Sequence, residues 1–297
     1  MLISIPGFTT TDQRDNSHPV HPVNPVRNGL AATLSLDEPK LPCYRFFLFF
    51  RFMHSYGPID SARVKRLGTV LTTVLDHIPF RIDTDALLAS LRVAARGEMA
   101  QEVLRLAQEA ETAARPRGLY KIAFVESRDA NSVVIDGWPF TSRVLRVNLD
   151  EVERVFPFVA TCGVELEAWS QSPNDMFGRY CADVIKDLAL EQAVRAIGEH
   201  LVNAYRPGAT SMMHPGSLDD WPVTEQGNLF ALLGDVAGAI GVRLTESFMM
   251  WPTKSVSGVW FPSEDGFESC RLCPREICPK RRTPYEPDLY DRKYRRG

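Results

Sequence analysis

Three cysteines near the C-terminal end have a spacing that suits a soft metal ion. Cys270, Cys273 and Cys278 form a C-x2-C-x4-C pattern, and a proline follows each of the last two. Closely spaced thiolates suit zinc or an iron–sulfur cluster, and both normally take four protein ligands. Cys162, at the end of an apolar run, is the best fourth candidate. The alternative is a set of free thiols, since the spacing differs from the paired C-x2-C motifs of a zinc ribbon.

A second candidate site lies in residues 241–261, which read as two strands joined by a connection that contains proline and lysine. Ser255, Ser257 and Gly258 are too small to fill a core. Glycine in a strand often marks a place where a backbone approaches a ligand closely. A β-bulge at a sheet edge is the other interpretation of the same residues.

The elements that would position these residues follow from hydrophobic periodicity and from helix and turn signals. The patterns predict helices over 59–77, over 83–114 with a break at Gly97, over 175–205 and over 224–240. They predict strands over 119–125, 133–135, 155–160, 242–250 and 256–261. Helices and strands follow one another without a repeating βαβ unit, so the prediction is an α+β fold with mixed helices packed on an antiparallel sheet.

The helix predicted over 175–205 is the longest element. Its predicted buried stripe consists of apolar residues at helical spacing, and Cys181 belongs to it. The members of this stripe are Met176, Phe177, Tyr180, Cys181, Val184, Ile185 and Leu188. The predicted solvent face carries Asp183, Lys186, Asp187, Glu191 and Arg195.

Composition limits the class of protein. The chain has 297 residues, of which 44% are hydrophobic and 24% charged, with a net charge of −3. These values are typical of a globular protein and do not favour nucleic acid as a partner. No apolar run is long enough to span a membrane, and no secretory signal is evident, so a cytoplasmic protein is expected.

The predicted organisation has three parts. Residues 1–52, which contain HPVHPVNPV, are expected to be a flexible leader or a segment upstream of the true start. Residues 53–262 form the predicted globular domain. Residues 263–297 form a tail with the cysteines and a basic end.

The motif in the second candidate site resembles that of a known family. The residues Leu244-Thr245-Glu246-Ser247-Phe248, then Met250-Trp251-Pro252, then Ser255-Val256-Ser257-Gly258, are similar to the C-terminal activation domain of cobalamin-dependent methionine synthase. In that family, the domain binds S-adenosylmethionine and supports reductive methylation of cobalamin. The resemblance therefore implies an activation-domain-like fold and a methyltransferase-related role.

The resemblance also implies candidate binding residues. The family's S-adenosylmethionine loop reads Arg-x-x-Pro-Gly-Tyr, and the matching residues here run from Met212 to Ser217, with His214, Pro215 and Gly216 between them. The arginine that would bind the ligand's carboxylate is replaced, and His214 or Lys254 is the candidate substitute. Glu199, Glu246, Ser255, Ser257 and Gly258 complete the implied binding set.

The resulting hypothesis is a protein that reactivates a corrinoid in trans. The cobalamin would be carried by a partner, either a corrinoid-binding protein or a methionine synthase without its own activation domain. A flavodoxin or ferredoxin would supply the electron, and an iron–sulfur centre would fit that role. The alternative is a non-catalytic, metal-stabilised module that docks a corrinoid protein without binding S-adenosylmethionine.

Overall fold

The computed structural model describes residues 62–67, 70–278 and 280–295. The elements in chain order are β1 (Ala62–Leu67), β2 (Val70–Leu75), α2 (Thr84–Leu91), α3 (Glu98–Ala113), β3 (Arg117–Lys121), β4 (Ala123–Arg128), β5 (Ser132–Ile135), β6 (Trp138–Thr141), α4 (Arg143–Asn148), β7 (Arg154–Thr161), α5 (Val164–Trp169), α6 (Met176–Tyr205), β8 (Thr210–Met213), η1 (Val223–Glu225), α7 (Gln226–Leu233), α8 (Val236–Ile240), β9 (Arg243–Leu244), β10 (Met250–Trp251), β11 (Ser255–Pro262), η2 (Ser269–Arg271) and η3 (Tyr290–Tyr294). The predicted leader, residues 1–52, lies outside the described residues.

Strand β7 is the centre of the main sheet. On one edge it pairs with β3 through residues 158–161 and with β4 through residues 154–155. On the other edge it pairs antiparallel with β11, and β11 pairs in turn with β8. Seven of the eight β7 side chains are buried, as expected for a strand covered on both faces. Pro157, which has no N–H to donate, lies where the neighbour changes from β3 to β4.

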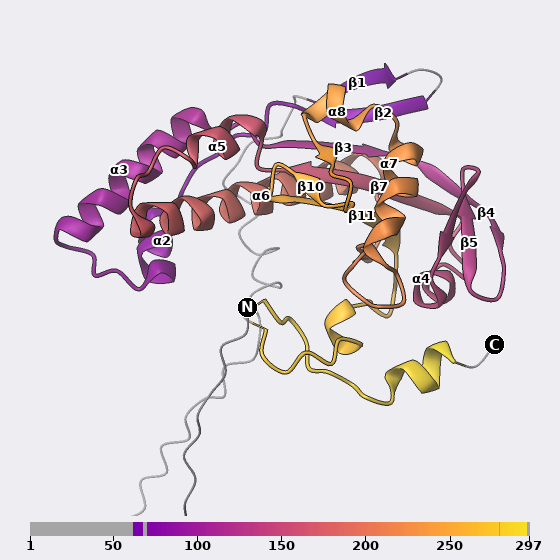
Figure 1. Cartoon of the computed structure of the whole chain (residues 1–297). Helices are drawn as coiled ribbons and strands as arrows, with labels where there is room; N and C mark the ends of the chain where they lie inside the picture. Colours follow the sequence, from indigo (N-terminus) through magenta and orange to yellow (C-terminus); the bar gives the residue numbers. More distant parts are fainter. Residues whose placement is uncertain (1–61, 68–69, 279, 296–297) are drawn as a thin grey trace, which may run out of the picture. The chain divides into compact units, whose positions relative to one another are not determined.

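Helices cover both faces of this sheet (Figure 1). The C-terminal half of α6 packs on one face, with small residues such as Ala193 and Ala196 against Phe156 and Phe158. Helices α4, α7 and α8 pack on the other face. The fold is therefore α+β with an antiparallel sheet, as predicted from the sequence.

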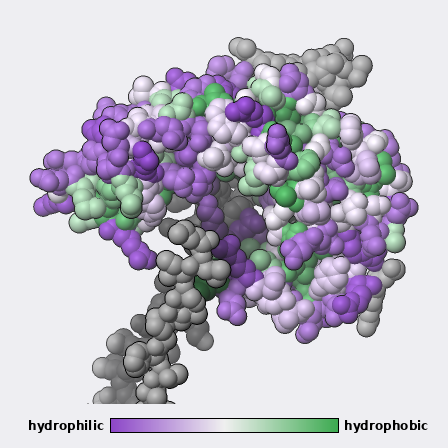
Figure 2. Space-filling model, viewed as in Figure 1, coloured by the Kyte–Doolittle hydropathy of each residue, from purple (hydrophilic) through white to green (hydrophobic). Residues whose placement is uncertain are grey.

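A second layer of helices surrounds the N-terminal half of α6. Helices α2, α3 and α5 pack with it around buried residues such as Leu87, Val103 and Cys181. Figure 2 shows that hydrophilic residues cover most of the visible surface of this layer, with a smaller hydrophobic group among them. No helix in residues 62–67, 70–278 and 280–295 is both long and apolar enough to cross a membrane.

The starts of α2, α3 and α6 agree with the predicted helix ranges. Asp83 caps α2 and Asp175 caps α6 through side-chain bonds to backbone N–H groups, and Gly97 precedes α3. Asp136 and Gly137 have φ values of 44° and 80°, which suit the two-residue hairpin turn between β5 and β6. The helix predicted over 224–240 is divided by Gly234 into α7 and α8.

The helix predicted over 59–77 is wrong, because residues 62–75 form the hairpin β1–β2. Their spacing of apolar residues fits a helix, but they include β-branched residues that favour strands, such as Thr72 and Val74. Strand β2 pairs with β3, so the sheet edge decides the structure of this segment. Short apolar runs are ambiguous by periodicity alone.

The predicted faces of α6 also need correction. Met176 and Tyr180 were expected in the buried stripe but are 88% and 54% exposed. Lys186 was expected on the solvent face but is 5% exposed. Small residues such as Ala182 and Ala189 form much of the buried face instead, because they allow the helices and the sheet to approach closely.

The segment after Pro262 contributes to the main core. Phe267, Leu289 and Tyr294 are buried in the same cluster as strands β3 and β7. The Tyr294 hydroxyl donates to Asn148 Oδ1 at 3.0 Å, and Arg143 Nε donates to the Tyr294 carbonyl at 2.7 Å. These bonds attach the C-terminal end to α4.

The close packing at Gly258 gives a stability prediction. A Cβ at Gly258 would lie 2.4 Å from the backbone oxygen of Met213, which cannot move without shifting β8. Gly258→Ala should therefore lower the free energy of unfolding by about 1–3 kcal/mol, measured by urea denaturation.

Gly118→Ala is the matched control for this prediction. A Cβ at Gly118 in β3 would meet only side-chain atoms of Ile197 closer than 3.0 Å, and that side chain can adjust. Gly118→Ala should therefore lower the free energy of unfolding by less than Gly258→Ala does. Equal losses at the two positions would contradict the role assigned to the β8 backbone.

Candidate functional site

The candidate binding loop, residues 212–217, lies against strand β11 at the end of β8. Met213, the last residue of β8, pairs with Val259, and His214 follows directly. His214 Nδ1 lies 2.9 Å from the Ser257 carbonyl oxygen. A Cβ at Gly258 would be 2.7 Å from His214 Nδ1, so the absence of a side chain makes room for the imidazole.

This packing revises the expected role of Gly258. The sequence suggested that this glycine admits a ligand, or that it marks a β-bulge. The structure shows that it admits the His214 ring and the β8 backbone. The β7–β11 pairing runs without a register shift from Ser255 to Trp260, so no bulge is present there.

His214 is held as a neutral side chain. Burial lowers its pKa from the ordinary 6.5, the bond to the Ser257 carbonyl opposes this shift, and the nearby charge of Arg282 lowers the pKa further. Its ring meets that of Phe158 edge-on at a centroid distance of 5.9 Å. The Ser257 carbonyl can only accept, so we assign the proton of the neutral ring to Nδ1.

Pro215 and Gly216 form a turn beyond His214. Gly216 has φ 82°, and its N–H donates to the Trp221 carbonyl at 2.7 Å. Ser217 N–H donates to the His214 carbonyl at 3.1 Å. Gly216 is exposed, so its backbone is accessible to a ligand from solvent.

Gln226 joins the two halves of the motif and was missed by sequence reasoning. The Ser257 hydroxyl donates to Gln226 Oε1 at 2.9 Å, and Gln226 Nε2 donates to the Phe248 carbonyl at 2.9 Å. Gln226 is buried at the start of α7, where a polar residue needs a partner. The one indication of this role in the sequence was a polar side chain at the start of a largely apolar helix. Glu246, in the same turn as Phe248, is exposed.

A buried ion pair supports the connection between β10 and β11. Lys186 Nζ lies 3.3 Å from Glu167 Oε2, and their exposed fractions are 5% and 7%. Thr253 donates to the same carboxylate oxygen through its N–H at 3.1 Å and its hydroxyl at 2.8 Å. This set connects α5, α6 and the residues before Ser255.

Lys254 and Ser255, which follow Thr253, also stabilise the connection between β10 and β11. Lys254 lies between two carboxylates of α6, with its Nζ 2.9 Å from Asp183 and 3.3 Å from Asp187. Ser255 Oγ hydrogen-bonds to the Pro252 carbonyl at 2.8 Å and lies 2.9 Å from Thr161 Oγ1. The Ser255 hydroxyl therefore stabilises the connection between β10 and β11.

Glu199 lies on α6 next to Gly198, where Trp260 of β11 packs on the helix. Burial raises the pKa of its carboxyl above the ordinary 4.5, and the charge of Arg195 opposes this shift. It is a half-buried carboxyl on the helix that covers the β11 face carrying Trp260.

The structure gives the predicted four-cysteine metal site no support. Within the described residues, no three His, Cys, Asp or Glu side chains are grouped so that they could hold a metal ion. Cys162 is fully buried in the helical cluster, and burial raises the pKa of its thiol to about 12. It is a core residue rather than a thiolate ligand.

The cysteine loop is organised by an arginine instead. The Arg281 guanidinium donates to the carbonyls of Cys270 at 3.0 Å and Cys273 at 3.2 Å, and also to the carbonyl of Arg275. Cys270, Cys273 and Cys278 are free thiols of intermediate exposure. Backbone carbonyls therefore converge on the guanidinium.

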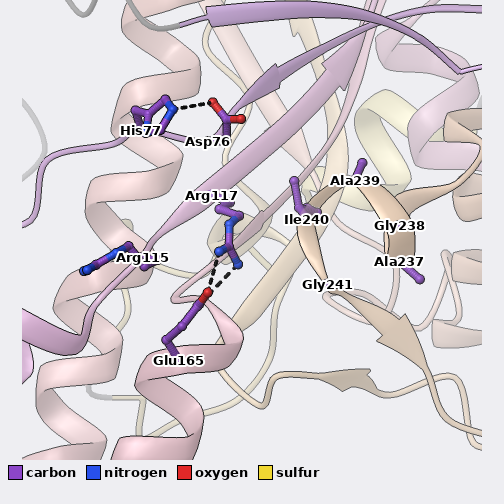
Figure 3. Close-up of a pocket in the computed structure, with 10 residues that line it drawn as sticks. All are labelled: Asp76, His77, Arg115, Arg117, Glu165, Ala237, Gly238, Ala239, Ile240 and Gly241. Atoms are coloured by element: carbon purple, nitrogen blue, oxygen red, sulfur yellow. Dashed lines mark hydrogen bonds and ion pairs between the residues drawn. The ribbon is translucent and has the colours of Figure 1, made fainter.

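A polar cavity of about 520 Å³ lies elsewhere, beside α8 and the start of β3. Figure 3 shows Arg117 directed at Glu165, and His77 beside Asp76. None of the predicted binding residues lines this cavity, so the motif and the cavity are separate features.

The loop and the motif lie in a segment that matches the model of a known protein family. Residues 212–268 match the family model described as vitamin B12 dependent methionine synthase, activation domain. This segment runs from the end of β8 through β11, so it contains the loop, Gln226 and the motif. The resemblance predicted from the sequence is confirmed over these residues.

The chain is also similar to a solved structure. That structure is described as the crystal structure of the MetH reactivation domain bound to AdoHcy, and the match has a TM-score of 0.48 and 18% sequence identity. The match covers 72% of this chain and 83% of that chain. No curated protein matches the chain by sequence.

The buried Lys186–Glu167 pair gives a second prediction. Lys186→Met should leave the Glu167 carboxylate buried without its cation and reduce the free energy of unfolding by about 3–5 kcal/mol. Urea denaturation measures this loss. Arg105→Met, which removes two exposed ion pairs on α3, should change stability little. Similar losses in both variants would contradict the importance of burial.

The neutral state of His214 predicts a pH dependence. Because its folded pKa lies below 6.5, the unfolded chain takes up this proton first as the pH falls. The free energy of unfolding should decrease below about pH 6.5, and His214→Gln should make that decrease smaller. His200 has a pKa lowered in the same direction, so the decrease should not vanish.

Urea denaturation at about pH 5 and about pH 8 separates the two effects of this substitution. At the higher pH, any difference in the free energy of unfolding between wild type and His214→Gln reports the loss of packing. A pH dependence that is unchanged in the variant would show that His214 does not titrate as described.

Proposed function

We propose that this chain binds S-adenosylmethionine beside the His214–Gly216 loop and supports reductive methylation of a corrinoid carried by a partner protein. The observation that carries the proposal is the family match over residues 212–268, which spans both the loop and β11. The packing of His214 on Ser257 and Gly258 holds these two parts together.

The chemistry would come from the cosubstrate and the corrinoid. One electron reduces cob(II)alamin to cob(I)alamin, and the methyl group of the sulfonium then passes to cobalt, which leaves S-adenosylhomocysteine. An electron donor of the flavodoxin or ferredoxin class would supply the electron. The protein contributes binding and orientation, so no nucleophilic side chain is needed.

The residues of the site suit this role in part. Gly216 would present an exposed backbone to the ligand beside the partly buried Pro215, and it has no side chain to block approach. Glu199, when ionised, would supply negative charge for the ligand's cationic groups. The partner would be a corrinoid-binding protein or a methionine synthase without its own activation domain.

Gly216→Val tests the binding site. Isothermal titration calorimetry with S-adenosylmethionine should show saturable one-to-one binding to wild type and a loss of at least tenfold in affinity for the variant. The added side chain would occupy the surface that the ligand approaches, and its Cβ would lie 3.2 Å from Val223 Cβ.

Gly208→Val is the matched control for backbone strain. Gly208 has φ 76°, close to the 82° of Gly216, but a Cβ there has no atom within 4 Å. This variant should bind S-adenosylmethionine like wild type. Equal weakening by both substitutions would show that strain alone, and not a ligand site, explains the loss.

The methyl-transfer step is tested with a separately produced cobalamin-binding domain of a methionine synthase. With its cobalamin reduced anaerobically by titanium(III) citrate, methylcobalamin should accumulate only when this chain and S-adenosylmethionine are both present. Absence of binding heat at millimolar S-adenosylmethionine would overturn the proposal. Capture of the cobalamin-binding domain in that case would favour the non-catalytic docking module.

A further inference from the structure

S-adenosylmethionine ends in an amino acid group, so a site that recognises the whole molecule needs a cation for the carboxylate. The two substitutes expected from the sequence do not fit this need. His214 is neutral and engaged with the Ser257 carbonyl. Lys254 is held by Asp183 and Asp187 in the N-terminal half of α6, whereas β11 packs on this helix at Gly198, more than ten residues further along.

The C-terminal segment brings an arginine toward the same loop. Phe267 N–H donates to Ser211 Oγ of β8 at 2.6 Å, three residues before His214. This bond places the next residue, Glu268, beside β8. Arg282 Nη2 lies 2.9 Å from Glu268 Oε2, so Arg282 is held at the same strand.

Two further observations concern the surroundings of this arginine. Its charge contributes to lowering the pKa of His214. The preceding residue, Arg281, is fixed by bonds to carbonyls of Cys270 and Cys273. Lys280 Nζ, one residue earlier, lies 3.3 Å from Asp187 of α6. The segment therefore passes from Asp187 of α6 toward β8, where Arg282 pairs with Glu268.

We propose that Arg282 binds the carboxylate of S-adenosylmethionine in this protein. The inference rests on the proposed function, since it assigns a residue of the same site. Arg282 lies beyond residues 212–268, so the segment that matches the family model does not contain it.

The chemistry of Arg282 and Glu268 suits an amino acid group. A guanidinium is a planar fork that can donate two parallel hydrogen bonds to a carboxylate, whereas an ammonium is a point charge. The Arg282 side chain is 32% exposed, so it is accessible while its position is restricted by Glu268. Glu268 would also attract the ligand's ammonium group.

Calorimetry with two ligands tests this assignment in the full chain. S-adenosylmethionine carries the carboxylate, and decarboxylated S-adenosylmethionine keeps the adenosine, sulfonium and ammonium groups without it. Arg282→Ala should weaken binding of S-adenosylmethionine by about tenfold or more and leave binding of the decarboxylated ligand unchanged. Arg282→Lys should recover part of the loss, because it keeps the charge without the fork.

Arg292→Ala is the control, because it removes an arginine of the same tail that pairs with Glu286. It should bind both ligands like wild type, and the melting temperatures of all variants verify folding. If wild type binds S-adenosylmethionine and Arg282→Ala binds it equally well, or loses both ligands equally, the assignment is overturned and the proposed function stands. If wild type binds neither ligand, the proposed function fails as well.

Discussion

The antiparallel pairing of β7 with β11 is the interaction on which the rest of the structure depends. It runs over six residue pairs from Ser255 to Trp260, and β7 is buried along nearly its whole length. Since β11 also pairs with β8, this register decides where the Ser257 carbonyl and Gly258 meet His214. A shift of one residue would reverse the faces of β11 and place Ser257 where Gly258 now accommodates the ring.

Close approach of α6 to the sheet is the second constraint, and a glycine on each of the two makes it possible. Gly198 of α6 lies against Trp260 of β11, and Gly118 of β3 lies against Ile197 of α6. The helix thus approaches the sheet closely at Gly198, the residue before Glu199. The motif residues serve first to build this packing, and the ligand-facing surface that we propose is left at the Pro215–Gly216 turn.

Polar contacts between distant segments complete the site. Gln226 connects β11 to the turn that contains Phe248, and the buried Lys186–Glu167 pair holds Thr253 before β11 begins. Buried polar groups of this kind are costly unless every partner is present, so they favour one arrangement of the loops. The tail is held by contacts of the same kind, among them the pairing of Arg282 with Glu268.

Residues close together in the chain account for the helix ranges and the motif. The helix starts near Asp83 and Asp175, the break at Gly97 and the family resemblance all depend on residues close together in the chain, so local rules predicted them. Tertiary structure alone decided the rest. The hairpin over 62–75 forms because β3 supplies a partner strand, and Lys186 is buried because Glu167 lies opposite it. Tertiary contacts also place the carbonyls around Arg281 and pair Arg282 with Glu268. Such contacts between segments far apart in the chain leave no periodic pattern in the sequence, so periodicity does not predict them.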